Sequence, residues 1–390
     1  MEGLPLTMGL AAPGGDVRSA EHPGVSSRIG VMRMSLSEAL GLGSAAWDAL
    51  QAGSASPSPF MTWAWHRSWA DSAPREEVQA SEALALCGAD GSLEALLPIR
   101  LGRVRFRRVW VRALTWAIGD TGCPDELEVP GLANADWPAL AAAVERLPWQ
   151  VIILSNLAAG APNMERLSAA LVERGHAARQ RALWPCPRLD LPASWDAYLG
   201  TLSANRRQIV RRKERSLRSS HAVAVTDYAA ERLDEGWAHL MALHQQRWEA
   251  AGGGAFRDPR TVHLQLQFAR DMAQRQRLWL TTLDLDGQPA AAWYGFASGD
   301  TVYFYQGGRD PRWERESVGL VLMGIMIRRA IERGYRAFNF LRGDDPYKQQ
   351  WTSSRRMTSE TVVFRSGWGG RWLRALDAVA ALRRSGPDDA

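Results

Sequence analysis

The residues whose types could do chemistry gather in one segment near the end of the chain, Phe338–Trp351. It reads FNFLRGDDPYKQQW, so it starts as a short apolar strand and continues as a cluster of ionisable groups. That cluster consists of Arg342, Asp344, Asp345, Tyr347 and Lys348. Together they offer an anion-binding guanidinium, two carboxylates, a phenol and an amine. A strand that runs directly into such groups indicates a site at its end.

The elements that must position this cluster follow one another in the second half of the chain. Apolar runs separated by the turn signals Asp286-Gly287 and Ser298-Gly299-Asp300 predict three strands, and Ser317 and Gly334 bound a helix. The predicted order is strand, strand, strand, helix, strand, with the bounds Leu278–Leu285, Ala290–Ala297, Thr301–Gln306, Ser317–Arg333 and Phe338–Leu341.

This order predicts where the cluster lies if the strands Thr301–Gln306 and Phe338–Leu341 are parallel. The helix is then their right-handed crossover, and ligands favour the crevice beyond the carboxyl ends of the strands. Gln306-Gly307 leaves one strand end and Arg342 leaves the other, while the helix start Ser317-Val318-Gly319 opens between them. The free N–H groups and positive dipole end of that helix suit an anion. The sequence therefore predicts one pocket that includes an anion site.

The first half repeats this order loosely. Its predicted strands are Leu84–Cys87, Leu93–Ile99, Val104–Trp110 and Gln150–Leu154, with a helix over Trp137–Leu147 before the last. We therefore expect an α/β (α+β) chain with two similar domains in tandem, each a mixed central sheet flanked by helices. The expected divisions are a flexible leader over 1–30, a first domain over 31–200, a basic connecting helix over 201–220, a second domain over 221–370, and a helix and tail over 371–390.

The connecting segment Ser203–Arg218 is strongly basic. Four of its arginines, Arg207, Arg211, Arg215 and Arg218, fall on one helical face. Two interpretations stay open: a solvated helix face, or an electrostatic platform for phosphates or an acidic polymer. RNA is the weaker choice of ligand, because the segment has no interleaved aromatic residues on which bases could stack.

A further helix is predicted over Glu231–Ala250, with His244 on its apolar stripe. A histidine in that position is either a buried core residue or a catalytic one, and the sequence leaves both open. Three glycines at 252–254 end the helix and form either a lid or a connector.

Composition limits the class of protein. The 390 residues are 46% hydrophobic and 23% charged, which excludes a largely disordered chain. The formal net charge of +5 permits an anionic ligand without requiring a nucleic acid. Cys87, Cys123 and Cys186 are too scattered for a disulfide framework or a zinc site. The start of the chain does not read as a signal peptide and no apolar run is long enough to span a bilayer, which predicts a soluble cytoplasmic protein.

Lysine is rare in this chain. Of 47 basic residues only Lys213 and Lys348 are lysine, and the rest are arginine. Lys348 is either needed as a compact ammonium whose pKa can shift on partial burial, or it is there by accident.

Motifs along most of the chain carry a family resemblance. They are SPF at Ser58–Phe60, CPRLDLP at Cys186–Pro192, LSANRRQIVRR at Leu202–Arg212, LHQQRW at Leu243–Trp248, YQGGRDPRW at Tyr305–Trp313 and FLRGDDPYKQQW at Phe340–Trp351. With the element order above, the chain resembles the GCN5-related N-acetyltransferase (GNAT) superfamily. Two such domains in tandem resemble the Fem-type peptidoglycan aminoacyltransferases. The motifs are most similar to acetyltransferases typified by the CelD cellulose-biosynthesis proteins, also described as BioF2-like.

The resemblance implies an enzyme that transfers an acyl group from acetyl-CoA or another acyl-CoA to an amine, without a metal. The implied acceptor class is a sugar or a polysaccharide or cell-envelope precursor. Tyr347 resembles the acid that protonates the leaving thiolate, and Lys348 resembles the lysine that stabilises charge at the reacting carbonyl. Asp344 or Asp345 is expected to act as base or to hold the amine.

The resemblance also implies binding residues. Coenzyme A contacts are expected from Gln306, Gly307, Ser317, Val318 and Gly319. Substrate contacts are expected from Arg342, His244, Arg247 and Trp248. One departure concerns the pyrophosphate loop, which is usually Gln/Arg-x-x-Gly-x-Gly/Ala. The helix start here offers only Ser317-Val318-Gly319, and Gln306-Gly307-Gly308 lies too far upstream in the sequence to replace the loop directly.

Rival interpretations stay open. One is a Fem-like aminoacyl-tRNA-dependent transferase, in which the Ser203–Arg218 helix grips the RNA. Another is a catalytically silent module that binds a polymer or a partner. Within the cluster itself, Arg342 and Asp344 could form a structural ion pair with Tyr347 as a packing residue. Outside the tRNA alternative, no nucleic-acid partner is expected.

Overall fold

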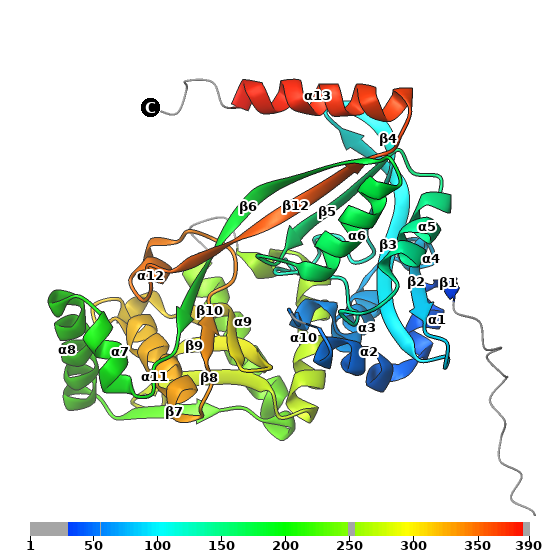
Figure 1. Ribbon diagram of the computed structural model, residues 1–390. Helices are drawn as coiled ribbons and strands as arrows, with labels where there is room; N and C mark the ends of the chain where they lie inside the picture. The colour runs from blue at the N-terminus through cyan, green and yellow to red at the C-terminus, as the bar shows by residue number, and fades with distance from the viewer. Residues whose placement is uncertain (1–29, 55, 249–253, 385–390) are drawn as a thin grey trace, which may run out of the picture.

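The structure is a computed structural model that describes residues 30–54, 56–248 and 254–384. In these ranges the strands form one 12-stranded sheet in the order β1-β2-β3-β4-β5-β12-β6-β11-β10-β9-β8-β7, with helices packed on both faces (Figure 1). The expected mixed α/β architecture is confirmed. The leader expected over 1–30 lies outside the described residues except for Gly30, and so do Gly252 and Gly253 of the expected lid or connector.

Strands and helices are interspersed along the whole described chain. The strands are β1 Gly30–Ser35, β2 Ser81–Cys87, β3 Leu93–Phe106, β4 Val109–Trp116, β5 Val151–Leu157, β6 Ala177–Asp190, β7 Val223–Asp227, β8 Leu278–Leu285, β9 Gln288–Ser298, β10 Thr301–Arg309, β11 Ala337–Asn339 and β12 Arg355–Phe364. The α-helices are α1 Leu36–Gly41, α2 Gly43–Ala52, α3 Trp63–Ser72, α4 Arg75–Gln79, α5 Trp137–Arg146, α6 Pro162–Glu173, α7 Trp195–Thr201, α8 Ala204–Ser220, α9 Leu233–Trp248, α10 Pro259–Gln274, α11 Val318–Glu332, α12 Pro346–Gln349 and α13 Trp368–Arg384.

The two halves share one element order. In the second half β8, β9 and β10 form an antiparallel meander, α11 follows, and β11 pairs in parallel with β10. In the first half β2, β3 and β4 form the meander, α5 follows, and β5 pairs in parallel with β4. The predicted repeat of strand, strand, strand, helix, strand is therefore present in both halves.

The strand predicted over Val104–Trp110 is wrong. Arg107 and Arg108 form a turn with φ of 48° and 71°, and β3 and β4 pair on either side of it, with Phe106 opposite Val109. Apolar residues and arginines alternate only as far as Arg107, and the two adjacent arginines 107 and 108 break the pattern at the turn. Glycine and asparagine usually mark such a turn, and neither is present.

Two long strands join the halves into one sheet. Strand β12 lies between β5 and β6, and β6 pairs with β12 along most of its length and with β11 at its end. Residues 355–364 thus pair with a strand of the first half, although they were expected within a second domain over 221–370. The domain boundaries stay a prediction, but the shared strands mean that the halves fold against one another.

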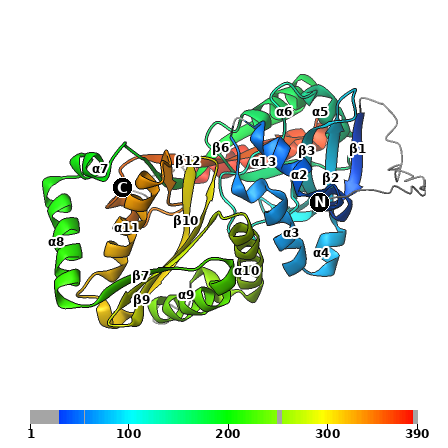
Figure 2. The ribbon, with the colours of Figure 1, turned by 90° about the horizontal axis from the view of Figure 1, so that it is seen from below.

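Side chains of β9 show why helices cover both faces of the second-half strands. Ala291 and Trp293 pack in the cluster that contains α11, whereas Ala292 and Tyr294 pack in the cluster that contains α9. Because successive side chains of a strand point to opposite faces, one apolar run supplies core side chains to the helix layers on both faces of the sheet. Figure 2 shows α11 and α8 on one side of these strands and α9 and α10 on the other.

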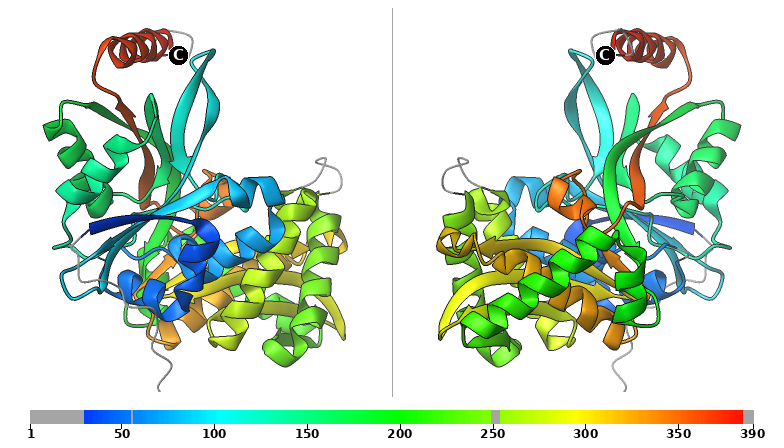
Figure 3. Two further views of the ribbon diagram at one scale, coloured as in Figure 1. Left: turned by 90° about the vertical axis from the view of Figure 1, so that its right-hand side faces the viewer. Right: turned by 90° about the vertical axis from the view of Figure 1, so that its left-hand side faces the viewer.

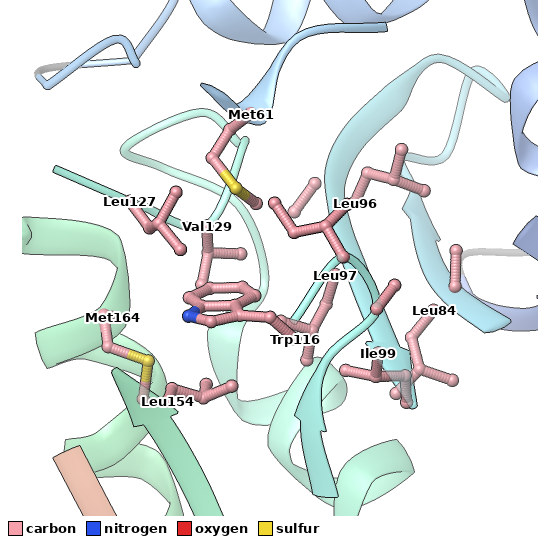
Figure 4. Packing of buried hydrophobic residues seen from close by; sticks show 14 of the residues in the cluster. Met61, Leu84, Leu96, Leu97, Ile99, Trp116, Leu127, Val129, Leu154 and Met164 are labelled. Carbon is pink, nitrogen blue, oxygen red and sulfur yellow. The ribbon is translucent and has the colours of Figure 1, made fainter. Parts of the chain in front are cut away.

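The core of the first half forms where its sheet meets the flanking helices. Trp116 packs there among aliphatic side chains and two methionines, Met61 and Met164, from different helical segments (Figure 4). The same cluster also includes Phe296, Tyr303 and Leu341 of the second half. The first half is therefore packed directly against the strands that lead to the candidate site.

Candidate active site

Strands β10 and β11 separate at the point where the candidate site begins. Their parallel pairing covers only Thr301–Tyr303 and Ala337–Asn339, and a bulge interrupts β10 between Phe304 and Gln306. The prediction that these strands are parallel and joined by a crossover helix is confirmed. Two adjoining cavities lie beyond the paired segment, where the chain from each strand diverges.

The helix-side cavity, of about 300 Å³, lies at the start of α11. Residues that line it include Arg206, Arg247, Gly307, Gly308, Arg309, Glu314, Ser317, Gly319 and Tyr347. Three guanidinium groups therefore face one carboxylate. Since the first-turn N–H groups of a helix lack intrahelical partners, α11 adds donors to the same wall. This cavity suits an anionic ligand.

Ser317 does not cap α11 in the way that its position predicted. Its side chain makes no capping hydrogen bond, and its backbone is left-handed with φ of 60°. The Ser317 carbonyl accepts from the N–H groups of Leu320 and Val321 at 3.0 and 3.1 Å. A left-handed serine costs about 1 kcal/mol, and such strain is found at sites where the backbone must take a set direction. Val318 is buried in the core beneath the cavity wall.

Residues that are distant in sequence complete the helix-side cavity. Gly307 and Gly308 of β10 line it together with Ser317 and Gly319, so sequence separation does not keep the two glycine segments apart. Gly308 also lets α9 approach, because a Cβ there would lie 2.4 Å from the backbone N of His244. The pocket wall is made from two chain segments instead of one continuous loop.

The lysine-side cavity, of about 370 Å³, lies on the other side of Tyr347. Its lining includes Cys123, Asp125, Arg247, Trp248, Tyr305, Gln306, Arg342, Asp345, Tyr347 and Lys348. Arg247, Phe304 and Tyr347 line both cavities. The helix start and Lys348, which the sequence predicted at one pocket, are therefore on adjoining walls.

Tyr347 occupies the boundary between the cavities. Its ring packs edge-on to Phe304, with ring centroids 6.4 Å apart, and the Arg247 guanidinium lies 5.5 Å from its centroid. Burial, and next the Asp345 carboxylate, raises the pKa of the phenol. Tyr347 thus keeps its proton near neutral pH and can act there as a general acid.

Lys348 is buried, with a side chain 6% exposed. Its Nζ donates to the carbonyl oxygen of Arg342 at 2.7 Å and lies 3.2 Å from Oδ2 of Asp345. Burial lowers the pKa of this amine, and the Asp345 carboxylate opposes that shift. A buried ammonium at a cavity wall can stabilise a developing oxyanion there.

The two lysines make the pKa of Lys348 directly measurable. We expect NMR of protein labelled with ¹³C at lysine Cε to give two titrating signals, with Lys348 assigned from a Lys213→Arg variant. Because burial disfavours the charged amine, Lys348 should titrate below the ordinary lysine value of 10.5. A midpoint at or above that value would contradict the burial and contacts described here.

Arg342 is held by two carboxylates of the first half. Its Nη2 donates to Oδ1 of Asp120 at 2.7 Å, and its Nε lies 3.0 Å from Oδ1 of Asp125. The Arg342 backbone N also donates to Oδ2 of Asp125 at 3.0 Å. The Arg342–Asp344 pair considered from the sequence does not form, because the segment 120–125 supplies the partners. Arg342 therefore fixes the strand end against the first half.

Asp120 and Asp125 are the main site-forming residues that sequence reasoning missed. Asp125 is 1% exposed and lines the lysine-side cavity. Burial raises its pKa to about 6, although Arg342 lowers it. The two aspartates lie in a Gly- and Asp-containing segment, Gly119–Glu126, that reads as an ordinary loop. No local pattern links it to a strand end more than 200 positions later.

The two adjacent carboxylates of the cluster differ in position. Asp345 pairs with Lys348 and lines the lysine-side cavity. Asp344 is exposed and lines neither cavity; its Oδ1 accepts from Nε2 of Gln349 at 2.7 Å, and its Oδ2 lies 3.6 Å from Arg355. Of the two residues predicted as base or amine contact, only Asp345 faces the site.

The end of α9 supplies two of the three residues predicted from it. Arg247 and Trp248 line the lysine-side cavity, and the Arg247 guanidinium lies 4.9 Å from the Trp248 ring centroid. His244 is 3% exposed and lines neither cavity. Its ring packs on Phe256. Burial, and to a smaller extent the positive charge of Arg247, lowers the pKa of His244 to about 4. These contacts favour the core interpretation of His244.

The basic helix α8 contributes one residue to the site. Arg206 lines the helix-side cavity, lies 4.8 Å from the Trp351 ring centroid and donates from Nε to the Gln350 carbonyl at 3.2 Å. Of the face predicted from the sequence, Arg211, Arg215 and Arg218 are exposed. Arg211 pairs with Asp196 at 3.1 Å. That face points to solvent and is not part of either cavity.

Comparison with protein families agrees with this geometry. Residues 204–349 match the family model described as Acetyltransferase (GNAT) domain. The chain contains a GNAT-type acetyltransferase domain. It spans α8 to α12 and includes the strand pair, the crossover helix and Lys348. No curated protein matches the chain.

Solved structures show that a likeness of fold extends over most of the chain. FemX has 11% identity and a TM-score of 0.55, over 85% of this chain and 96% of that one. A C-terminal domain of a putative lysylphosphatidylglycerol synthetase from Agrobacterium fabrum has 12% identity and a TM-score of 0.52, over 89% and 97%. A conserved protein of unknown function from Bacteroides thetaiotaomicron has 13% identity and a TM-score of 0.54, over 83% and 98%. At such identities the likeness concerns the fold alone.

Two properties of the described residues bear on metal binding and on membranes. No group of three or more His, Cys, Asp or Glu side chains in that part of the chain could hold a metal ion. None of its helices combines the length and apolar character that crossing a membrane requires.

Proposed function

We propose that this protein is an N-acyltransferase that moves an acyl group from acetyl-CoA or another acyl-CoA to an amine. The observation that supports this most is the shared wall of the two cavities. A cation-lined cavity at a helix start meets, across Tyr347, a cavity that holds a buried lysine and a carboxylate. The first suits a phosphate-bearing donor, and the second suits an amine acceptor.

The residues present fit coenzyme A as a co-substrate. Its pyrophosphate is an anion, and the helix-side cavity offers Arg206, Arg247 and Arg309 beside the first turn of α11. Ser317, Val318 and Gly319 would supply backbone contacts there, and Gly307 would border the same ligand. Gln306 lines the lysine-side cavity, where it would contact the donor nearer its acyl end. These arginines would bind the pyrophosphate in place of the backbone contacts that the usual loop provides.

The side chains of the lysine-side cavity support one reaction scheme. Asp345 accepts the proton that the amine loses as its nitrogen bonds to the thioester carbonyl carbon. Lys348 stabilises the negative charge that develops on the carbonyl oxygen. Tyr347 then gives its proton to the thiolate that leaves as the carbon–sulfur bond breaks. One proton is taken from the amine and one is added to sulfur, so the overall transfer is balanced once Tyr347 is reprotonated from Asp345 or solvent.

The acceptor class and location rest on the resemblance to the CelD and BioF2-like acetyltransferases. We propose an amino sugar or another precursor of a polysaccharide or the cell envelope, modified in the cytoplasm. A second candidate is a Fem-like transferase that uses aminoacyl-tRNA. The exposed Arg211, Arg215 and Arg218 of α8 favour it, since they are free of the cavities and could contact a nucleic-acid backbone.

Calorimetry with acetyl-CoA and with uncharged tRNA tests the proposal. We expect a micromolar dissociation constant for acetyl-CoA and weakening in an Arg309→Gln variant, because Arg309 lines the helix-side cavity. Binding of tRNA alone would move the function to the Fem-like case. Binding of neither would favour a catalytically silent module and remove the acyltransferase proposal.

Tyr347→Phe should lower turnover by about tenfold to 100-fold, with little change in the Michaelis constant for the acyl donor. The loss is at the lower end for acid catalysis because a thiolate is a fairly good leaving group. The measurement is thiol release from acetyl-CoA with an amine acceptor found by screening amino sugars. Tyr335→Phe is the matched control, since Tyr335 packs against Trp279 and lines neither cavity. Unchanged turnover in Tyr347→Phe would exclude the phenol as the acid.

A further inference from the structure

Helix α13, Trp368–Arg384, lies at one end of the molecule, apart from the helices that surround the cavities (Figures 1 and 3). One of its faces is fixed to the body. Leu373 is buried with Phe106 and Phe364, and Asp377, also buried, lies 2.6 Å from Nη2 of Arg107. Arg179 pairs with the second oxygen of Asp377. The orientation of α13 is therefore set by an apolar contact and two ion pairs.

The outward face of α13 carries an exposed apolar stripe. Trp368 is 87% exposed, Trp372 53% and Val379 48%, and Ala375 between them is exposed as well. Their spacing of four, three and four residues places them on one side of the helix, opposite Leu373 and Asp377. Two tryptophans in water at adjacent turns are an unusual feature of a surface, and they indicate a binding partner.

The charges beside this stripe have one sign. Arg371 and Arg374 are exposed, and no ion pair joins either of them to a carboxylate within the described residues. Asp377 is the one acidic residue in the sequence of α13, and it is buried against the body. The outward face thus combines apolar and cationic side chains with no anionic one.

We propose that α13 binds the surface of an anionic lipid bilayer, with its axis in the plane of the membrane. Tryptophan favours the boundary between lipid headgroups and acyl chains because its ring is apolar and its N–H is polar. Arginines at the edge of the stripe reach the phosphates while their stems remain in the apolar layer. Charge complementarity therefore favours an anionic bilayer over a neutral one.

The same charges argue against α13 pairing with a second copy of the chain. In a two-fold symmetric contact each outward face meets an identical one. Arg371 and Arg374 would then face their own counterparts with no carboxylate to separate them, which is unfavourable. A bilayer with acidic headgroups supplies the negative charge that the helix face lacks.

The proposed membrane face is separate from the candidate active site. Strand β12 runs from the end near α12 to the end near α13 (Figure 1). Its ten residues span about 30 Å at the usual rise of a strand. The proposal does not depend on acyl transfer, and binding can be measured without an enzyme assay.

Co-sedimentation of the full chain with vesicles tests this inference. Vesicles of phosphatidylcholine alone are compared with vesicles that also contain phosphatidylglycerol, at low and high salt. We expect binding to the anionic vesicles only, and weaker binding at high salt. A Trp368→Ser/Trp372→Ser variant should bind at least tenfold more weakly, and an Arg371→Gln/Arg374→Gln variant should lose most of the salt dependence. Because the replaced side chains are exposed, thermal unfolding should be nearly unchanged.

Trp184→Ser provides the matched control, because Trp184 is 49% exposed on β6 and is not part of α13. It should bind vesicles as the unmodified protein does. Failure of the unmodified protein to sediment with anionic vesicles would overturn the proposal, and so would full binding by the double tryptophan variant. Light scattering that shows a dimer, converted to a monomer by Trp368→Ser/Trp372→Ser, would instead assign the stripe to an interface between copies.

Discussion

Lys348→Met is expected to reduce the turnover number for acyl transfer by about 10³-fold while the protein stays folded. Methionine has a similar length and suits a buried position, but it cannot donate a hydrogen bond or carry charge. The carbonyl of Arg342 would lose its 2.7 Å donor, which costs about 1 kcal/mol of folding stability. Turnover is measured as thiol release from acetyl-CoA, and folding by circular dichroism during thermal unfolding.

Lys213→Met is a closely matched control for this experiment. Lys213 is the other lysine of the chain, and its Nζ also donates to a backbone carbonyl at 2.7 Å, that of Arg315. It lines neither cavity. The control should keep full turnover. If Lys348→Met retained more than about a tenth of the original rate, the ammonium would not stabilise the transition state.

Arg342→Gln is expected to lower the free energy of unfolding by about 3 kcal/mol near neutral pH. The substitution leaves Asp125 buried without the cation that lies 3.0 Å from it, and an uncompensated buried carboxylate is costly. It also removes the link between the strand end and Asp120. Chemical denaturation of the variant and the unmodified protein gives the difference in unfolding free energy.

The pH dependence of that difference identifies its cause. Burial raises the pKa of Asp125 to about 6 in the folded protein, above the ordinary 3.8, and loss of Arg342 should raise it further. The folded state then binds a proton more readily than the unfolded chain, so stability attributed to this group decreases as pH rises through that window. The defect of Arg342→Gln should therefore be smaller at about pH 5 than at about pH 8.

Arg67→Gln serves as the control for loss of an arginine–carboxylate pair. Arg67 and Asp71 lie one turn apart on α3, and their side chains are 54% and 43% exposed. Solvent screens such a pair, so its removal should cost less than about 1 kcal/mol at any of these pH values. Equal losses in Arg67→Gln and Arg342→Gln would show that burial of Asp125 has no special effect on stability.

Local patterns determined the elements around the site. Apolar runs bounded by turn residues placed β8, β9, β10 and α11 within a few positions of their bounds, because hydrophobic period and turn chemistry act over neighbouring residues. The parallel direction of two neighbouring strands then fixed which strand ends meet. Lys348 and Tyr347 could be found in this way, since both lie within ten residues of a strand end.

Local patterns gave a wrong or undecided prediction where turn residues were missing and where two adjacent residues were of the same type. The adjacent residues Arg107 and Arg108 interrupt the apolar-arginine alternation at a hairpin turn, but without glycine or asparagine there one strand was predicted in place of the ends of two. Asp344 and Asp345 are identical in type and adjacent in sequence, and nothing local distinguishes the exposed one from the one that faces Lys348.

By itself, the sequence determined the repeated element order, the parallel strand pair and the cluster that follows it. Only the tertiary structure decided that Asp120 and Asp125 hold Arg342 and that β12 joins the first-half strands. The physical reason is the separation along the chain of the residues that interact. Periodicity and turn preference express interactions among residues a few positions apart, whereas these contacts join positions up to 222 apart and depend on sheet register and packing between the two halves.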